Sequence, residues 1–283
     1  MAVFWMDGKF VQPEEAKVSV YDHGLLYGDG VFEGIRVYKG KAFRLDDHLE
    51  RLSDGARALL IDVPYTREEL KAAVTEACAR RPHEDGYIRL VVTRGAGDLG
   101  LNPRLCARAT VFLILDKIQL YPAQTYTDGI PLITASTRRV PLVCLDPRIK
   151  TLNYLNNIQA KQEALMAGKL EALLLNTDGL VAECTADNIF LVKKGRLITP
   201  DTIYGALDGI TRRVVLELAR QMELPVTVGA VALTDLYNAD EAFMTGSGAE
   251  IVPVIELDGR KIGSGKPGPV TQRLIQAFHQ ATL

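Results

Sequence analysis

The chain has 283 residues, of which 47% are hydrophobic and 24% charged, and its formal net charge is −2. This balance is typical of a globular protein, excludes a disordered chain, and argues against a basic surface for nucleic acid or anionic lipid. No apolar stretch approaches the roughly 18 residues of a membrane span. The four cysteines lie far apart, which argues against a zinc site and against disulfides. We therefore expect a cytoplasmic protein that binds small molecules.

Strand patterns dominate the beginning of the chain. Asp7-Gly8 provides the positive φ angles of a tight hairpin turn, and Thr66 with Glu69 predicts a capping box that opens a helix. Leucine and alanine recur at helical spacing in the segment before Thr66, which places Arg51 on a helix. The expected elements are strands at 3–6, 10–11, 31–38 and 41–45, helices over 49–60 and 67–81, and strands at 87–93 and 109–116.

Periodicity is lost between residues 117 and 130, where Pro122, Asp128 and Gly129 indicate a linker. We therefore predict a small N-terminal α+β domain at 1–119, a linker at 120–128 and a larger, β-rich C-terminal domain at 129–283. The expected elements of the second domain are a strand at 129–136, a helix over 155–167, short strands at 172–175, 180–183, 189–192 and 197–199, and a helix over 212–222 that begins near Ile210-Thr211.

Two residues in the second half suggest an amine and its partner. Lys150 stands just before an apolar, asparagine-rich helix start, where partial removal from water disfavours the ammonium form and favours Schiff-base chemistry. Glu183 is the kind of group that a pyridine-containing cofactor needs at its ring nitrogen. Because the chain has 33 Lys and Arg in all, an ordinary solvated lysine is the alternative interpretation of Lys150.

Two glycine-containing segments could hold a phosphate. Gly209-Ile210-Thr211 opens a predicted helix, whose N-terminus offers backbone N–H groups and the positive end of the helix dipole. Thr245-Gly246-Ser247-Gly248 follows an apolar strand and offers a hydroxyl and further N–H groups. An ordinary helix cap and an ordinary turn are the alternatives. Gly263-Ser264-Gly265-Lys266 precedes a proline rather than Ser or Thr, so we reject a nucleotide-binding loop there.

Three segments of the second domain follow a fixed spacing: Glu183-x-Thr185-x-x-Asn188-Ile189-Phe190, Leu197-x-Thr199 and Leu207-x-Gly209-Ile210-x-Arg212. This pattern resembles the complete signature of the class IV, pyridoxal-phosphate-dependent aminotransferases. Within that class, Phe32-Glu33-Gly34-Ile35-Arg36 and Tyr87-x-Arg89 resemble the branched-chain amino-acid aminotransferases in particular. The resemblance implies the two-domain α+β architecture called fold type IV, shared with D-amino-acid aminotransferases, and a homodimer or a higher homo-oligomer.

The resemblance also implies a cofactor, pyridoxal 5′-phosphate, and no metal. Lys150 would be the catalytic residue, which forms a Schiff base with the cofactor and then shuttles a proton. Glu183 would keep the pyridine nitrogen protonated. Tyr154 would reach the phenolic oxygen of the cofactor. The phosphate would be held by a positive side chain, hydroxyls and backbone N–H groups, which belong to Arg51, Gly209, Ile210, Thr211 and Ser247.

For the substrate, the resemblance implies that the Ser247-Gly248 turn holds the α-carboxylate. An apolar and aromatic pocket would take the side chain, and Arg89 at its mouth would pair with the distal carboxylate of glutamate. The pocket residues would be Tyr27, Phe32, Gly34 and Tyr87, some of which could instead be ordinary core residues, as Arg51 and Arg89 could be surface ion-pair partners.

The predicted reaction moves an amino group between branched-chain L-amino acids (leucine, isoleucine and valine) and 2-oxoglutarate. The alternatives on the same scaffold are a D-amino-acid or (R)-amine transaminase and an aminodeoxychorismate lyase-like enzyme. The segment 93–100 lacks the Arg-x-His pair of D-amino-acid aminotransferases, which favours the first prediction. A non-catalytic phosphate- or metabolite-binding protein is the alternative from another functional class.

Overall fold

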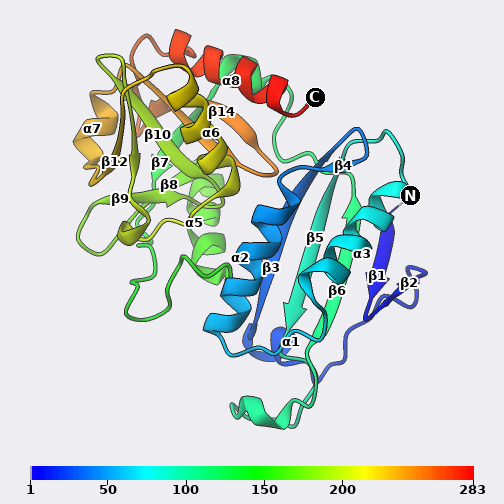
Figure 1. Ribbon diagram of the computed structural model, residues 1–283. Helices are drawn as coiled ribbons and strands as arrows, with labels where there is room; N and C mark the ends of the chain where they lie inside the picture. Colours follow the sequence, from blue (N-terminus) through cyan, green and yellow to red (C-terminus); the bar gives the residue numbers. More distant parts are fainter. Residues whose placement is uncertain (1) are drawn as a thin grey trace. The chain divides into compact units, whose positions relative to one another are not determined.

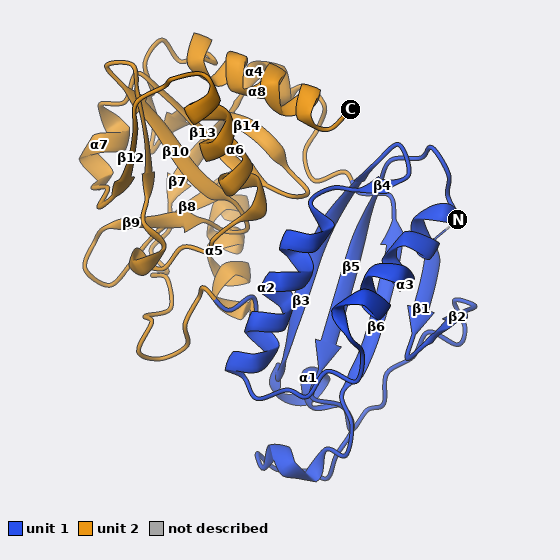
Figure 2. Cartoon of the chain, viewed as in Figure 1, with its two compact units in different colours: residues 1–118, 149–153 blue, residues 119–148, 154–283 orange. Residues whose placement is uncertain are grey.

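The computed structural model describes residues 2–283, which fold as two compact units (Figure 2). Unit 1 contains the described residues up to Ile118 together with Ile149–Asn153, and unit 2 contains Gln119–Arg148 and Tyr154–Leu283. The short segment Ile149–Asn153 packs with unit 1, although the sequence alone placed it within one C-terminal domain. Each unit combines helices with a sheet, which confirms the predicted α+β class.

Unit 1 is built on an antiparallel sheet in the order β2-β1-β6-β5-β3-β4. The predicted hairpin is confirmed, since Asp7 and Gly8 both have positive φ between the first two strands. The strand predicted over 41–45 is wrong beyond Ala42, because Leu45 already begins a helix. The strands are β1 (Val3–Met6), β2 (Lys9–Val11), β3 (Gly30–Tyr38), β4 (Lys41–Ala42), β5 (Gly86–Thr93) and β6 (Thr110–Asp116).

The helices of unit 1 are α1 (His23–Tyr27), α2 (Leu45–Ala58) and α3 (Arg67–Ala79), with a 3₁₀ turn at Pro103–Leu105. Figure 1 shows α2 and α3 lying on the same face of the sheet. Thr66 caps α3 as predicted: its hydroxyl accepts from the Glu69 N–H at 3.2 Å, and the Glu69 carboxylate accepts from the Thr66 N–H at 2.7 Å. This reciprocal pair defines where α3 begins.

The two faces of β3 and β5 have different roles. Side chains alternate across a strand, so Ile35 of β3 and Ile88 and Leu90 of β5 enter the core beneath α2 and α3. Phe32 is buried too but lies outside that core, since it occupies the opposite face of the sheet. This second face therefore offers side chains for something other than packing against the helices.

Unit 2 contains a mixed sheet in the order β12-β11-β10-β13-β14-β7-β8-β9, with β15 paired to β14. The β11–β12, β14–β7 and β7–β8 pairs are parallel and the other pairs antiparallel. The strands are β7 (Ile130–Thr134), β8 (Glu171–Leu175), β9 (Val181–Cys184), β10 (Asn188–Lys193), β11 (Arg196–Pro200), β12 (Val226–Gly229), β13 (Glu241–Gly246), β14 (Glu250–Leu257) and β15 (Arg260–Lys261).

The helices of unit 2 cover its sheet. Two phenylalanine rings, Phe190 of β10 and Phe243 of β13, stack at 5.0 Å in its core, and Phe278 of the last helix is buried as well. Another helix packs its buried alanines, Ala160 and Ala164, against β8. The helices are α4 (Thr125–Asp128), α5 (Leu155–Met166), α6 (Ile210–Gln221), α7 (Leu233–Tyr237) and α8 (Pro269–Ala281), with a 3₁₀ turn at Thr202–Tyr204.

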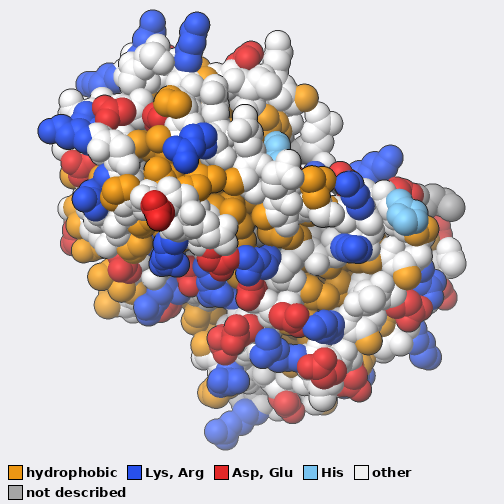
Figure 3. All heavy atoms as spheres, turned by 45° about the horizontal axis from the view of Figure 1, so that its top comes forward, with side chains coloured by type: hydrophobic (Ala, Val, Ile, Leu, Met, Phe, Trp, Pro, Cys, Tyr) orange, Lys and Arg blue, Asp and Glu red, His pale blue; other side chains and the backbone are white. Residues whose placement is uncertain are grey.

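The face drawn in Figure 3 carries side chains of both charge signs, intermingled rather than gathered into one basic region. This distribution agrees with the formal net charge of −2. Within residues 2–283, no helix combines the length and the apolar character needed to cross a lipid bilayer.

Candidate functional site

Lys150 lies beside the free edge of β3. The Phe32 N–H donates to the Lys150 carbonyl at 3.0 Å, and the Leu152 N–H donates to the Gly30 carbonyl at 2.9 Å. These bonds explain why Ile149–Asn153 belongs to unit 1. They also place the Lys150 Nζ 4.3 Å from the centroid of the Phe32 ring, so that the aromatic face shields one side of the amine from water.

Four predicted substrate residues share the sheet face on which Phe32 lies. Gly34 pairs with Arg89 across β3 and β5, and the Arg89 guanidinium carbon lies 4.4 Å from the Phe32 ring centroid and 5.6 Å from that of Tyr87. A Cβ atom on Gly34 would lie 1.8 Å from the Tyr87 hydroxyl oxygen, so a larger residue there would displace the Tyr87 side chain. The structure thus brings Phe32, Gly34, Tyr87 and Arg89 together with Lys150.

Arg51 reaches the core face of the same strand from α2. Its Nε and Nη2 donate to the two carboxylate oxygens of Glu33 at 2.7 and 2.8 Å, and the His48 Nδ1 lies 2.6 Å from Glu33 Oε2. Burial alone would raise the pKa of Glu33, but the charges and hydrogen bonds of Arg51 and His48 outweigh it and hold that pKa well below its usual range.

The roles of Glu33 and His48 were missed at the level of sequence. Glu33 occupies a core-facing position between Val31 and Ile35, and a charged residue in such a run signals a buried partner. Tyr27 lies in another setting at the end of α1. It is 37% exposed, and its hydroxyl accepts from the Gly100 N–H at 3.0 Å.

Glu183 is buried on β9 in unit 2 and accepts hydrogen bonds from three directions. The Arg139 Nη2 lies 2.7 Å from its Oε1, while the Asn188 Nδ2 and the Leu207 N–H donate to its Oε2 at 3.0 and 2.9 Å. One charged and two neutral donors suit an ionised carboxylate. Arg139 was not predicted, because an isolated arginine far from Glu183 in sequence has no local signal.

Asn188 connects Glu183 with the start of α6. A Cβ atom on Gly209 would lie 2.1 Å from the Asn188 side-chain oxygen, so a larger residue there would displace the side chain that donates to Glu183. Gly209 is the N-cap of α6 and provides no side-chain cap, while Ile210 and Thr211 in the first turn are buried. The backbone N–H groups of this turn are therefore available for an anion.

The Ser247-Gly248 turn follows β13, which pairs with β10. Thr245 is the register partner of Asn188, so the turn begins close to the loop around Gly209. The Thr245 hydroxyl oxygen is buried and makes no hydrogen bond with any residue that the structure describes. A buried polar atom of this kind is costly unless a bound group satisfies it. Ser247 and Gly248 themselves are half-buried.

Tyr154 is the residue immediately before α5 and the first residue of the second stretch of unit 2. It is half-buried. Lys150 lies four residues earlier and belongs to unit 1.

Unit 2 also contains a buried acidic cluster that the sequence did not indicate, and one of its members, Asp187, follows Glu183 closely in the chain. The Tyr121 hydroxyl lies 3.0 Å from Glu171 Oε2 and 3.2 Å from Asp187 Oδ2, and the Lys161 Nζ lies 2.9 Å from Glu171 Oε2. Burial and then the negative charge of Glu171 raise the pKa of Asp187 to about 7. A Cβ atom on Gly246 would lie 1.9 Å from Asp187 Oδ1.

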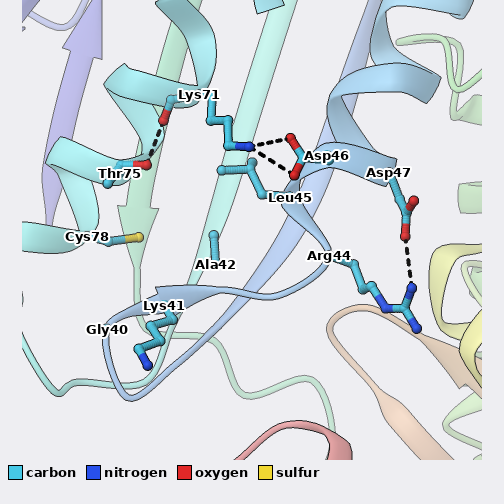
Figure 4. A pocket seen from close by; sticks show the side chains of 10 residues that line it. All are labelled: Gly40, Lys41, Ala42, Arg44, Leu45, Asp46, Asp47, Lys71, Thr75 and Cys78. Carbon is cyan, nitrogen blue, oxygen red and sulfur yellow. Dashed lines mark hydrogen bonds and ion pairs between the residues drawn. The ribbon is translucent and has the colours of Figure 1, made fainter. Parts of the chain in front are cut away.

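Unit 1 also has a surface cavity of about 580 Å³ where β4 and the start of α2 meet the middle and end of α3 (Figure 4). Lys71 pairs with Asp46 at 2.7 Å and Arg44 with Asp47 at 3.5 Å, so its charges are largely neutralised in pairs. None of the predicted site residues lines it. Across residues 2–283, no group of three or more His, Cys, Asp or Glu side chains could hold a metal ion.

Comparison with known proteins covers nearly the whole chain. The family model of the class IV amino-transferases matches residues 30–257. A putative branched-chain-amino-acid aminotransferase of Methanocaldococcus jannaschii is 51% identical over 97% of this chain and 94% of its own length. A D-alanine aminotransferase of Bacillus licheniformis is 36% identical over 98% of this chain and 96% of its own length. A solved structure of a T.th. branched-chain amino acid aminotransferase, complexed with N-(5′-phosphopyridoxyl)-L-glutamate, has 38% identity and a TM-score of 0.92 over 99% of this chain and 94% of that one.

Proposed function

Because the chain belongs to the class IV aminotransferases, which use pyridoxal 5′-phosphate, we propose that it transfers an amino group between branched-chain L-amino acids and 2-oxoglutarate. The observation that supports this most is the cluster of Phe32, Tyr87 and Arg89 beside the Lys150 amine. Its aromatic rings suit a leucine side chain, and its guanidinium suits the distal carboxylate of glutamate.

The side chains of unit 2 fit the cofactor. Glu183 is a buried carboxylate held by donors, as a pyridine nitrogen that must keep its proton requires. The first turn of α6 lacks a side-chain cap, and the nearby Thr245 hydroxyl lacks a partner among the described residues, as expected where a phosphate binds. We assign phosphate binding to Gly209, Ile210, Thr211 and Ser247 of unit 2 and to Arg51 of unit 1, and the phenolic oxygen of the cofactor to Tyr154.

When bound, pyridoxal 5′-phosphate supplies the carbonyl that takes up the amino group and a ring that withdraws electrons from the substrate Cα. The Lys150 Nζ removes the proton from the substrate Cα, and the Phe32 ring limits the access of water to that amine. Glu183 holds a proton at the ring nitrogen. The Ser247-Gly248 turn binds the substrate α-carboxylate, and Phe32, Gly34 and Tyr87 enclose its side chain.

A panel of single amino donors with 2-oxoglutarate tests the proposal, with glutamate formation as the measurement. Leucine, isoleucine and valine should serve as donors, whereas activity with D-alanine but not with L-leucine would contradict the L-branched-chain assignment. The similarity to a D-alanine aminotransferase is the reason to include the D-amino acids. The contacts of Arg94 in the segment 93–100 argue against the D-specific alternative. Its guanidinium already donates to Asp29 at 2.8 Å and to the carbonyl oxygens of Leu59 and Leu60.

Lys150→Ala should shift the absorption band of the protein loaded with cofactor to that of the free aldehyde and lower its activity by a factor on the order of 10³ or more. Lys9→Ala removes an exposed lysine of the same unit and is the matched control, which should leave both unchanged. If Lys150→Ala keeps its colour and its activity, the catalytic role of Lys150 is refuted.

We further propose that the chain forms at least a homodimer in the cytoplasm. The segment around α1 and the loop that follows β5 are joined by the hydrogen bond between Tyr27 and Gly100, and they expose large apolar side chains. Those side chains are Val20, Tyr21, Leu25, Leu99 and Leu101. The four free cysteines agree with a reducing compartment. Sedimentation of Leu25→Glu should give monomers where the unaltered chain gives dimers.

A further inference from the structure

Arg139 is a buried residue that pairs with Glu183 and contacts two further segments of unit 2. It lies in the connection that follows β7 and is only 7% exposed. Its Nη2 donates to Glu183 at 2.7 Å, its Nη1 to the Asn157 side-chain oxygen at 2.9 Å and its Nε to the Gly205 carbonyl at 2.9 Å. The planar guanidinium can satisfy three acceptors in fixed directions, which a lysine ammonium cannot do.

The contacts of Arg139 extend to two further segments near Glu183, α5 and the loop that leads to α6. Asn157 of α5 links Arg139 to the segment just after β9, because its side-chain nitrogen donates to the Thr185 carbonyl. Gly205 belongs to the loop that leads to α6, and the Leu207 N–H of that loop donates to Glu183. Arg139 therefore fixes both the position of the Glu183 carboxylate and the loops on either side of it.

The charge of Arg139 determines whether Glu183 is held as an ionised carboxylate or as a protonated acid. A carboxyl group buried without a cation tends to keep its own proton, because the charged form loses its hydration. A protonated Glu183 would donate a hydrogen bond to a pyridine nitrogen and leave the ring neutral. An ionised Glu183 accepts a hydrogen bond, so the proton stays on the nitrogen and the ring is a stronger electron acceptor.

We propose that Arg139 is a positioning residue that acts through Glu183 to keep the ring nitrogen of the cofactor protonated. This inference rests on the proposed function, since it needs a pyridine cofactor at Glu183. Arg139 touches neither the cofactor nor the substrate in this role. Its effect must therefore depend on two things: the carboxylate of Glu183 and the nitrogen atom of the ring.

The test compares two cofactors that differ only at the ring nitrogen: pyridoxal 5′-phosphate and its 1-deaza analogue, in which a C–H group replaces that nitrogen. Their dissociation constants are measured for the wild type, Arg139→Met and Arg139→Lys. Arg139→Met should weaken the binding of pyridoxal 5′-phosphate about tenfold, roughly the value of one hydrogen bond to a charged group, and that of the deaza analogue less than twofold. Arg139→Lys, which keeps the charge, should recover part of the difference.

Two further measurements separate positioning from mere structural support. In the Glu183→Gln background, Arg139→Met should weaken the binding of pyridoxal 5′-phosphate by less than a further twofold. Arg139 acts on the ring only through the Glu183 carboxylate, which this background lacks. The visible absorption change of the loaded Arg139→Met protein should also have its midpoint at higher pH, since a neutral ring no longer repels a proton at the nitrogen of Lys150. Arg81→Met, which alters a buried arginine of unit 1, should bind both cofactors as the wild type does.

The proposal would be overturned if Arg139→Met weakened the binding of both cofactors equally. It would also be overturned if the losses of affinity caused by Arg139→Met and Glu183→Gln were fully additive. If Arg139→Met does not fold, the comparison of Arg139→Lys with the wild type decides: a loss confined to the natural cofactor supports the proposal, and an equal loss for both refutes it. Failure of the proposed function would be distinguishable, because the wild-type protein would then transaminate none of the donors.

Discussion

Two buried carboxylates, Glu33 of unit 1 and Asp187 of unit 2, are held in opposite ways. In unit 1, Glu33 lies between a bidentate Arg51 and His48, so positive partners surround it. In unit 2, Asp187 shares the hydroxyl of Tyr121 with a second carboxylate, Glu171. A tyrosine hydroxyl has one proton and can donate to only one of them, so the other contact needs a proton on the carboxyl group.

The hydrogen bonds indicate which carboxyl of unit 2 keeps that proton. Glu171 accepts from Lys161 and from the backbone N–H groups of residues 172 and 185 as well as from Tyr121, a set that suits an ionised group. Asp187 has the raised pKa, about 7. A buried acid stays charged where cations surround it and takes up a proton where other acids surround it. Glu33 and Asp187 therefore make the stability of the fold respond to pH in opposite directions.

Glu33→Gln should produce the largest change, a loss of about 3–5 kcal/mol in the free energy of unfolding of unit 1 near pH 7. The substitution leaves the positive charge of Arg51 buried without its counter-ion. Folding lowers the pKa of Glu33, so its stabilisation is present above the unfolded value of about 4.3 and is lost as the pH falls toward the folded value. Urea titration followed by the fluorescence of Trp5, the single tryptophan, measures it.

Glu76→Gln is the control for this prediction. Glu76 forms an exposed pair with Arg80 at 2.7 Å on α3, and its loss should cost less than about 0.5 kcal/mol. If both substitutions cost the same, burial does not distinguish the two ion pairs, and the interpretation of Glu33 as a charge held by cations must be abandoned.

Asp187→Asn should have an intermediate effect of the opposite sign, a gain in stability that is about 2.7 kcal/mol larger at pH 8 than at pH 5. Folding raises the pKa of Asp187, so stability is lost as the pH rises from the unfolded value near 3.9 through the folded value of about 7. Asparagine keeps the neutral state at every pH. Thermal melts followed by circular dichroism at pH 5, 6.5 and 8 would show a gap that widens with pH; a gap of constant size argues against a titrating Asp187.

Tyr121→Phe should have the smallest effect, a loss of about 1 kcal/mol at pH 5, because it removes one hydroxyl that links Asp187 with Glu171. Combined with Asp187→Asn in a double-mutant cycle, it should show coupling of at least about 0.5 kcal/mol, as contacting residues do. Strict additivity of the two substitutions would mean that the shared hydroxyl does not connect them energetically.

Local structure was largely predictable from the sequence. Asp7-Gly8 defines its hairpin and Thr66 its helix start because both depend only on neighbouring residues, and the alternation along β3 and β5 follows from the strand period. The last helix, α8, was not predicted, although Pro269 stands in its first turn and Leu274 and Phe278 have the spacing of a buried helical face. The sequence therefore contained the signal for this helix.

The spacing of residues around Glu183 also determined the family, because a cofactor requires particular groups at particular points of a chain. Tertiary structure alone decided which side chains became partners: Arg139 for Glu183, Arg51 and His48 for Glu33, and Tyr121 for Asp187. It also placed Lys150 on the edge of β3 rather than with the strands that follow it in sequence. Periodicity describes one segment at a time, whereas burial and charge pairing depend on which distant segments share the same interior.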